Sequence, residues 1–267
     1  TLFRSLLQRT SRGVTPTSAG LAFYSQAQLA LRHADDAILA AREARLSGHV
    51  SVGMAPSTAS VLGVPFINAM RESYPDVRLH LVESLSGNLE RMINTRQLDL
   101  AIVFQQEKIL RWSARPVLEE RLFLIGTHAL LAPLQEDHIS PDQLTSLPLI
   151  MPSQGHGLRG RLEAVCQQHH LSVEVVADID GLALLMQAVR SGLGATLQPG
   201  AAISHLDHQA LRVIDVVNPI LSRPNFLVSL SDDELTPAGL AARVILSKVM
   251  RQLVESDRWP GATLYAH

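Results

Sequence analysis

A short polar corner near residue 56 has the residue types of an anion-binding site. Residues 49–55 alternate apolar with small or polar side chains, the period of a strand, and Ala55-Pro56-Ser57-Thr58 then supplies a break and N-cap candidates for a following helix. The free backbone N–H groups and positive dipole end at a helix N-terminus suit a carboxylate or phosphate. In the simpler alternative, the Ser57 or Thr58 hydroxyl only caps the helix.

A second polar corner of the same kind lies near residue 155. A predicted strand is followed by Ser153, Gln154 and the glycine-flanked His156, with Arg159 close to the start of the next helix. An imidazolium and a guanidinium beside a helix N-terminus would bind an anionic ligand. The alternative for Arg159 is a position that simply faces solvent.

Residues that could carry catalysis do not form a recognisable constellation. Cys166 is the single cysteine, and with His169 it fits helix packing and a helix surface better than a metal site. The sequence has no G-x-S-x-G, H-E-x-x-H or P-loop motif. We therefore expect a binding protein rather than an enzyme, with no catalytic residue, no metal ligand and no cofactor.

Alternating strands and helices position the first corner. The expected elements are strand 49–55, helix Val64–Ser73 with Pro65 in its first turn, strand Val77–Glu83, helix Asn88–Arg96 and strand Leu98–Phe104. This order implies a parallel sheet with right-handed crossovers, whose ligands bind beyond the carboxyl ends of the strands. Ser57, Ser86 and Phe104 all lie at those ends.

A second α/β unit follows, beginning with a long strand over Pro116–Gly126. Its further strands are expected near Leu147–Met151, Val173–Asp178, Ala195–Gln198, Leu211–Val217 and Phe226–Ser231. Its helices are expected over Leu158–His169 and Leu182–Arg190, and an amphipathic helix over about Pro237–Glu255 precedes a short tail that begins at Trp259. Two facing units would each present one polar corner.

One long helix is expected before these units, over residues 17–47. The stretch has no proline and is rich in alanine and long side chains, which predicts about 30 helical residues, roughly 45 Å in length. A heptad seam runs along it through Tyr24, Ala27, Leu31, Ala34, Ile38 and Ala41. Because alanine alternates with larger residues, the seam favours close pairing with a second copy over packing within the chain.

The N-terminal end of the chain is basic although the whole chain is slightly acidic. Residues 1–49 carry a charge of +3, which leaves −5 for the remainder of a chain whose formal charge is −2. Arg9 and Arg12 flank a tight turn, which suits a loop or wing lying along a phosphate backbone. The alternative is a solvated loop with incidental arginines.

The composition limits the class of protein. The 267 residues are 46% hydrophobic and 18% charged, typical of a globular chain with room for roughly two domains. No run approaches the ~20 apolar residues of a membrane span, and the start lacks a signal-peptide pattern. We therefore expect a cytoplasmic protein with no membrane partner. The alternative, a stand-alone solute-binding protein, would need export and no dimerising helix.

Several local motifs resemble those of the LysR-type transcriptional regulators. Leu6–Gly20 is similar to the end of that family's winged helix-turn-helix domain and the start of its linker helix. The effector-domain landmarks are matched by Gly48–Gly53, Tyr74-Pro75, Leu98–Ala101 and Gly192–Ala195, and Ser153 with 156–159 matches a pattern of one subset. The resemblance covers nearly the whole chain.

The resemblance implies an α/β fold with a two-lobed, periplasmic-binding-protein-like effector domain. A wing remnant and the long linker helix of a winged helix-turn-helix domain would precede it. The implied boundaries are a wing over 1–16, a linker and dimerisation helix over 17–47, lobe I over 48–121 and 232–267, and lobe II over 122–231. The family's DNA-reading domain begins about 40 residues before the wing, so the recognition helix is expected to be missing from this sequence.

The implied function is a DNA-binding transcriptional regulator. A small anionic metabolite, a di- or tricarboxylate such as tricarballylate or citrate, would bind between the lobes and alter a homodimer or homotetramer on promoter DNA. By position the cleft residues are Ser57, Thr58, Ser86 and Phe104 in lobe I and Ser153, Gln154, His156 and Arg159 in lobe II. The charge of a tricarboxylate makes His156 and Arg159 the expected anchors, while Arg9 and Arg12 would contact the DNA backbone.

Overall fold

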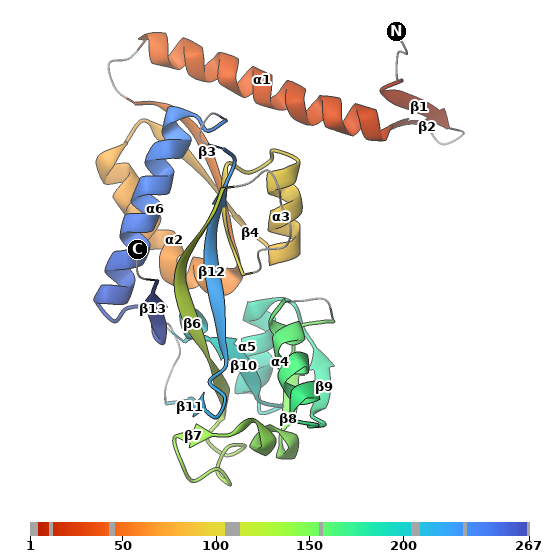
Figure 1. The fold of residues 1–267 in the computed structure, drawn as a ribbon, viewed down its shortest axis with the longest axis vertical. Coiled ribbons are helices and arrows are strands. Elements are labelled where there is room, and N and C mark those ends of the chain that lie inside the picture. Colours follow the sequence, from red (N-terminus) through yellow and green to blue (C-terminus); the bar gives the residue numbers. More distant parts are fainter. Residues whose placement is uncertain are drawn as a thin grey trace.

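The computed structural model describes residues 5–10, 13–42, 46–104, 113–154, 157–203, 209–231 and 234–265. Figure 1 shows two α/β lobes that follow one another along the long axis of the molecule, with one long helix lying across the outer end of the first lobe. Of the helices in these ranges, none is long and apolar enough to cross a lipid bilayer.

A hairpin and the long helix come first in the chain. Strands β1 (Leu7–Thr10) and β2 (Gly13–Pro16) pair antiparallel, and α1 covers Ser18–Arg42. The Thr17 hydroxyl oxygen accepts the N–H of Gly20 at 3.0 Å and so caps the helix. A Cβ at residue 20 would lie 1.9 Å from the Leu6 carbonyl oxygen, so glycine is required where the hairpin meets the first helical turn.

Lobe I is built on a sheet in the order β4-β3-β5-β12-β6. Its strands are β3 (Gly48–Met54), β4 (Val77–Glu83), β5 (Leu100–Val103), β12 (Ser222–Ser229) and the first part of β6 (Ser113–Thr127). The predicted parallel pairing of the first three strands is confirmed, and β12 runs antiparallel to β5 and β6. Helices α2 (Pro56–Ser73) and α6 (Pro237–Glu255) cover one face and α3 (Ser86–Asn94) the other (Figure 1).

The start of α2 differs from the prediction. The helix begins at Pro56, eight residues before Val64, so Pro65 lies in its interior rather than in its first turn. Proline is favoured at the first helical position, and Pro56 takes that role. An interior proline costs about 3 kcal/mol, but Leu62 and Phe66 on either side of it are fully buried in the core of lobe I. Their burial offsets that cost.

Lobe II surrounds the second part of β6. This part pairs with β10 (Thr196–Pro199) and β11 (Leu211–Val216), and β11 also pairs with β7 (His138–Ile139). The parallel strands β8 (Pro148–Met151) and β9 (Glu174–Asp178) join β10 through a bridge between Leu149 and Ala195. The remaining elements are α4 (Gly157–Gln168), α5 (Leu182–Arg190) and the short 3-10 helices η1 (Pro141–Ser146) and η2 (Gly200–Ala202).

Two C-terminal segments were assigned incorrectly from the sequence. Strand β12 was expected in the second unit, but Leu227 and Val228 pack in the core of lobe I, so the chain returns to the first sheet. The predicted tail after Trp259 contains strand β13 (Ala262–Leu264), which pairs with β6. Trp259 itself is buried in the core of lobe I, because its indole has both apolar neighbours and a buried hydrogen-bond acceptor.

The long strand β6 belongs to both lobes. Residues 113–121 pair with β12 and β13, whereas residues 122–127 pair with β10 and β11. The change of partners falls between Arg121 and Leu122. Movement of one lobe against the other must therefore bend the chain near this point.

Candidate functional site

A small pocket lies between the lobes, where several strands end. Its lining comes from both lobes: Ala55, Pro56, Ser57, Leu85, Phe104, Pro152, Leu158, Asp180, Leu182, Leu185, Gln198 and Arg223. Residues one or two positions after the ends of β3, β4, β5, β8 and β9 contribute, as expected for ligands bound at the carboxyl ends of strands. The pocket encloses about 30 Å³, room for about two water molecules, so a metabolite requires the lobes or side chains to move apart.

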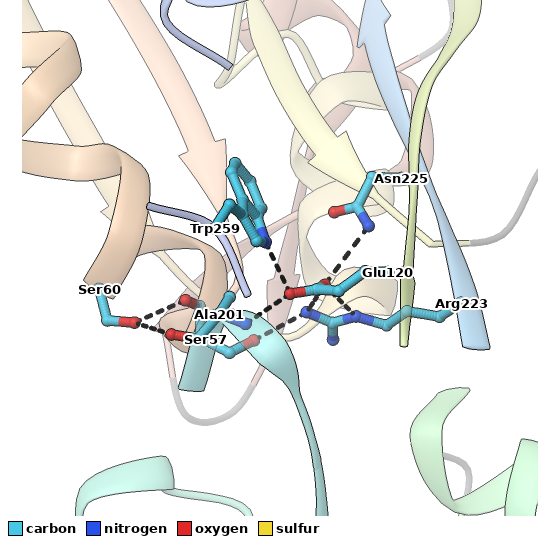
Figure 2. A network of polar contacts seen from close by, with 7 residues as sticks. All are labelled: Ser57, Ser60, Glu120, Ala201, Arg223, Asn225 and Trp259. Carbon is cyan, nitrogen blue, oxygen red and sulfur yellow. Dashed lines mark hydrogen bonds and ion pairs between the residues drawn. The ribbon is translucent and has the colours of Figure 1, made fainter. Parts of the chain in front are cut away.

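Arg223 forms the polar floor of this pocket. Its guanidinium carbon lies 3.7 Å from the centroid of the Phe104 ring, and its Nη2 donates to the Ser57 hydroxyl at 3.0 Å. The same side chain donates from Nε to Glu120 at 2.9 Å and forms an ion pair with it at 2.8 Å. Figure 2 shows Ser57 and Glu120 meeting the same guanidinium.

Glu120 is the centre of the buried network beneath the floor. Its carboxylate also accepts the N–H of Ala201 at 2.7 Å and the indole N–H of Trp259 at 2.8 Å, and it lies 3.5 Å from the Asn225 amide nitrogen (Figure 2). The Glu120 side chain is completely buried, and only such multiple donors make a buried carboxylate tolerable. The network joins β6, β12, η2 and the segment before β13.

The charge of Arg223 is maintained in spite of its burial. Burial lowers the pKa of Arg223, while the charge of Glu120 and the hydrogen bond to it raise that pKa. A guanidinium has so high an ordinary pKa that it stays protonated under these opposing influences. A fixed positive charge therefore lies at the edge of the pocket.

The capping interpretation of the first corner is wrong. The N-cap of α2 is Ala55, and no side chain caps the helix. Ser57 is instead a helical residue whose hydroxyl accepts a hydrogen bond from Arg223. Thr58 is completely buried, does not line the pocket, and its hydroxyl has no hydrogen-bond partner among the described residues.

The second corner presents an acid to the pocket. The backbone N–H and the hydroxyl of Ser153 donate to Asp180 Oδ1 at 2.9 and 2.8 Å. Asp180 lines the pocket, whereas Ser153 does not. The Ser153 hydroxyl is therefore engaged with a carboxylate, and lobe II contributes a hydrogen-bond acceptor to the site.

The other predicted cleft residues do not line the described pocket. Arg159 pairs with Glu163 at 2.7 Å and with Asp178 at 3.2 Å, so two carboxylates offset its charge. Gln154 is exposed, and Ser86 is a half-buried residue at the start of α3. His156 lies outside the described residues.

Sequence reasoning missed three polar pocket residues, namely Asp180, Gln198 and Arg223. Two of them carried a usable signal, because Asp180 follows β9 and Gln198 lies near the end of β10. The rule of strand ends that selected Ser57 would have selected both. Arg223 carried no such signal, since it lies near the beginning of β12.

The linker helix leaves its predicted seam uncovered where the structure describes it. Tyr24 is 59% exposed and Leu31 67% exposed, while Ala34 is exposed and Ala27 half-buried. The side chains of Ile38 and Ala41 lie outside the described part. On the hairpin, Arg9 is exposed on β1, and Arg12 is not among the described residues.

Comparison with known proteins establishes the class. The LysR substrate binding domain family matches residues 43–251, and the chain belongs to the LysR family of transcriptional regulators. It is 31% identical over 270 residues to the nitrogen assimilation regulatory protein nac of Escherichia coli (strain K12), covering 97% of this chain and 85% of that protein. It is 26% identical over 202 residues to the HTH-type transcriptional regulator CzcR of Bacillus anthracis, covering 75% and 67%.

Solved structures agree on the fold. A full-length OxyR variant from Pseudomonas aeruginosa superposes with a TM-score of 0.75 at 18% identity, over 98% of this chain and 84% of that one. The effector binding domain of QuiR in complex with shikimate gives 0.69 at 18% identity, over 77% and 98%. The two-lobed, periplasmic-binding-protein-like α/β fold is confirmed. The relatives are transcriptional regulators and not enzymes. Membership of this family also decides against the alternative of a stand-alone solute-binding protein.

Proposed function

We propose that this regulator senses a small di- or tricarboxylate in the pocket between its lobes. The observation that carries the proposal is the convergence of Arg223, the Ser57 hydroxyl and the N-terminal turn of α2 on that pocket. A guanidinium, a hydroxyl and free backbone N–H groups are the donors that a carboxylate requires.

Arg223 takes the anchoring role in this proposal. It is buried at the floor of the pocket, whereas Arg159 is paired with two carboxylates outside it. Asp180 on the opposite wall repels a second carboxylate but accepts a hydrogen bond from a hydroxyl group. Citrate carries such a hydroxyl and tricarballylate lacks one. Tricarballylate is nevertheless a candidate ligand, because the sequence resembles the regulator of tricarballylate utilisation in enteric bacteria.

The sensing event acts on an oligomer bound to promoter DNA in the cytoplasm. The seam of α1 pairs two copies, as a homodimer that can build a homotetramer, and the β1–β2 hairpin acts as a wing whose Arg9 and Arg12 contact phosphates. The exposure of Tyr24 and Leu31 supports this pairing. A ligand that favours one arrangement of the lobes then shifts the arrangement of the oligomer.

Thermal unfolding with a panel of carboxylates tests the effector assignment. A ligand at one hundred times its Kd stabilises the native state by about 2.7 kcal/mol, so an effector raises Tm in a concentration-dependent manner. The panel contains succinate, citrate and tricarballylate. If none of them raises the Tm of the wild-type protein, the carboxylate assignment is wrong.

Single substitutions then test the site. Ser57→Ala removes a pocket hydroxyl and is expected to raise the Kd of the ligand by about tenfold, the effect of one lost charge-assisted hydrogen bond. Ser86→Ala and Arg159→Ala are the matched controls, since neither residue lines the pocket. If the ligand-induced rise in Tm survives Ser57→Ala but is lost in Arg159→Ala, the ligand is anchored in lobe II instead.

A further inference from the structure

A second, larger pocket lies on the outer face of lobe I, between α6 and strands β6, β12 and β13. Its volume is about 420 Å³, compared with about 30 Å³ for the pocket between the lobes. The two pockets share no lining residue. The outer pocket is therefore a separate feature that the proposed effector site does not explain.

Positive charge is concentrated around this outer pocket. Arg115 of β6 and Arg243, Lys248 and Arg251 of α6 line it, and no aspartate or glutamate does so among the described lining residues. Along α6, Lys248 and Arg251 are three positions apart and Arg243 and Arg251 are eight apart, so each of these pairs lies on neighbouring parts of the helix surface. Arg243 and Lys248 are five positions apart, about 140° around the helix, so the three cations spread across the side of α6 that lines the pocket. The chain as a whole has a formal charge of −2, so this cluster is a local departure.

Three of these cations have no anionic partner within the described structure. Arg115, Lys248 and Arg251 form no ion pair and no side-chain hydrogen bond there. By contrast, Arg96, Arg159, Arg212 and Arg223 each pair with a carboxylate. Like charges around one cavity repel one another, and an anion between them would remove that repulsion.

The floor of the outer pocket is apolar. Val117, Leu227, Leu264 and Val244 contribute to it, and Val244 is 64% exposed in the middle of the basic helix face. Burying this surface against an apolar body is favourable. A cavity of a few hundred Å³ with apolar walls and a few charged groups is typical of small-molecule sites.

Tyr265 at the end of the pocket adds no negative charge. Its hydroxyl donates to the Glu119 carboxylate. Burial, together with that carboxylate, raises the pKa of Tyr265 to about 12, so the phenol stays neutral at physiological pH. The lining side chains themselves therefore carry only positive charge, and the Glu119 carboxylate contacts Tyr265 without lining the pocket.

We propose that this basic pocket, lined by Arg115, Arg243, Lys248 and Arg251, is a second small-molecule site. Its ligand is an organic anion with an apolar body and a charge of about −2 or more, carried by two carboxylate groups or by one phosphate group. The cations hold the charged groups, since guanidinium and ammonium groups bind both kinds of oxyanion. Val244 and its apolar neighbours contact the body of the ligand.

Isothermal titration calorimetry on the whole protein tests this proposal with defined probes. Benzene-1,3,5-tricarboxylate and 1-naphthyl phosphate supply the two anion types on an apolar ring, and inorganic phosphate supplies charge alone. We expect at least one aromatic anion to bind, and inorganic phosphate to bind about tenfold more weakly or worse, because it buries no apolar surface. Equal binding of inorganic phosphate would contradict the apolar part of the proposal.

Variants locate the bound probe. Lys248→Gln combined with Arg251→Gln is expected to raise the Kd of the aromatic anion by about tenfold or more. Val244→Glu is expected to abolish its binding. Arg71→Gln combined with Arg78→Gln is the control, because it removes two exposed cations of lobe I outside the pocket. All the altered side chains are exposed, and circular dichroism confirms folding.

Two results would overturn the proposal. One is that neither aromatic anion binds the wild-type protein. The other is that the Lys248 and Arg251 pair of substitutions has no greater effect than the Arg71 and Arg78 pair. In the second case Ser57→Ala shows whether the probe occupies the pocket between the lobes, so failure here remains distinct from failure of the proposed effector site.

Discussion

Glu120 and Arg223 form a buried ion pair on which several other buried polar contacts converge. Each partner is almost completely inaccessible to water, and each also binds neutral donors or acceptors around it. An ion pair removed from water in this way contributes little net stability by itself, but loss of one partner leaves an uncompensated charge. Single substitutions here should therefore have large effects.

Glu120→Gln tests that expectation. The amide has nearly the same shape but cannot neutralise the buried guanidinium of Arg223, so we expect the free energy of unfolding to fall by about 3–5 kcal/mol. Urea unfolding measures the change. Asp215→Asn is the control, because the Arg121–Asp215 pair, at 3.4 Å, is partly exposed and should contribute about 1 kcal/mol or less. Equal losses in both variants would contradict the argument.

Glu234 makes a smaller, pH-dependent contribution to the stability of the folded protein. Its hydrogen bond with Arg96 holds the pKa of Glu234 below the ordinary value of 4.5, against a weaker opposing effect of burial. Because the folded-state pKa is the lower one, the stabilisation is present at neutral pH and is lost as the pH falls below 4.5. The Tm difference between wild type and Glu234→Gln should shrink as the pH is lowered through this range. A difference that is constant with pH would count against this account.

Among the pocket residues, the sequence identifies those that follow strands and misses those whose partners are supplied by tertiary structure. Ser57 and Phe104 could be predicted because each follows a recognisable apolar strand and lines the pocket. Arg223 could not, because an arginine in the sequence Ser-Arg-Pro-Asn has the local pattern of an exposed residue. Its partner Glu120 is 103 residues away along the chain.

The elements of secondary structure owe their boundaries to local chemistry. At the start of α6, the Thr236 hydroxyl oxygen accepts the N–H of Gly239 at 3.0 Å, and Pro237 occupies the first helical position. The amphipathic pattern predicted α6 over about its observed bounds, and these contacts account for where the helix begins. At the start of α3, by contrast, the N-cap residue Leu85 provides no side-chain cap.

Thr236→Ala should therefore destabilise the protein by about 1 kcal/mol, because one backbone donor of α6 loses its partner. Chemical denaturation with the midpoint and slope fitted separately measures this change. Ser86→Ala at the uncapped start of α3 serves as the comparison and should cost a few tenths of that amount. If the two substitutions cost the same, the Thr236 cap is not what stabilises the start of α6.

Tertiary contacts determine the position of the segments that the sequence did not predict. Trp259 looks like the start of a loose tail because Pro260 and Gly261 follow it. The segment docks on the protein only because residue 200 is a glycine, where a Cβ would lie 1.6 Å from the Pro260 carbonyl oxygen. A contact between positions 60 residues apart leaves no periodic pattern in the sequence.

The whole molecule combines a receptor of two lobes with a helix that projects beyond them (Figure 1). The alternation of strands and helices was sufficient to predict the two lobes, because parallel sheets impose it on the chain. The return of β12 to lobe I was not predictable, since any apolar strand could pair with either sheet. The exposed seam on α1 leads to a prediction about how two copies of the molecule assemble.

Leu31→Glu should shift the protein toward the monomer. Leu31 is 67% exposed on the isolated chain, and we propose that a second copy covers it, so a charge there would be buried without a partner. Sedimentation velocity over a range of concentrations measures the change. Gln26→Glu adds the same charge to an exposed position away from the seam and should leave assembly intact. An unchanged mass distribution for Leu31→Glu would exclude the seam as the interface.

The hydrogen bond from Trp259 to Glu120 also has an optical consequence. The chain has two tryptophans, and in a Trp112→Phe background the emission comes from Trp259 alone. Its excited indole lies next to a carboxylate whose other oxygen accepts a hydrogen bond from Arg223, the arginine of the proposed effector pocket. Any ligand that draws Arg223 away changes the electric field at the indole, so the molecule carries a built-in fluorophore whose emission maximum should shift when the pocket fills.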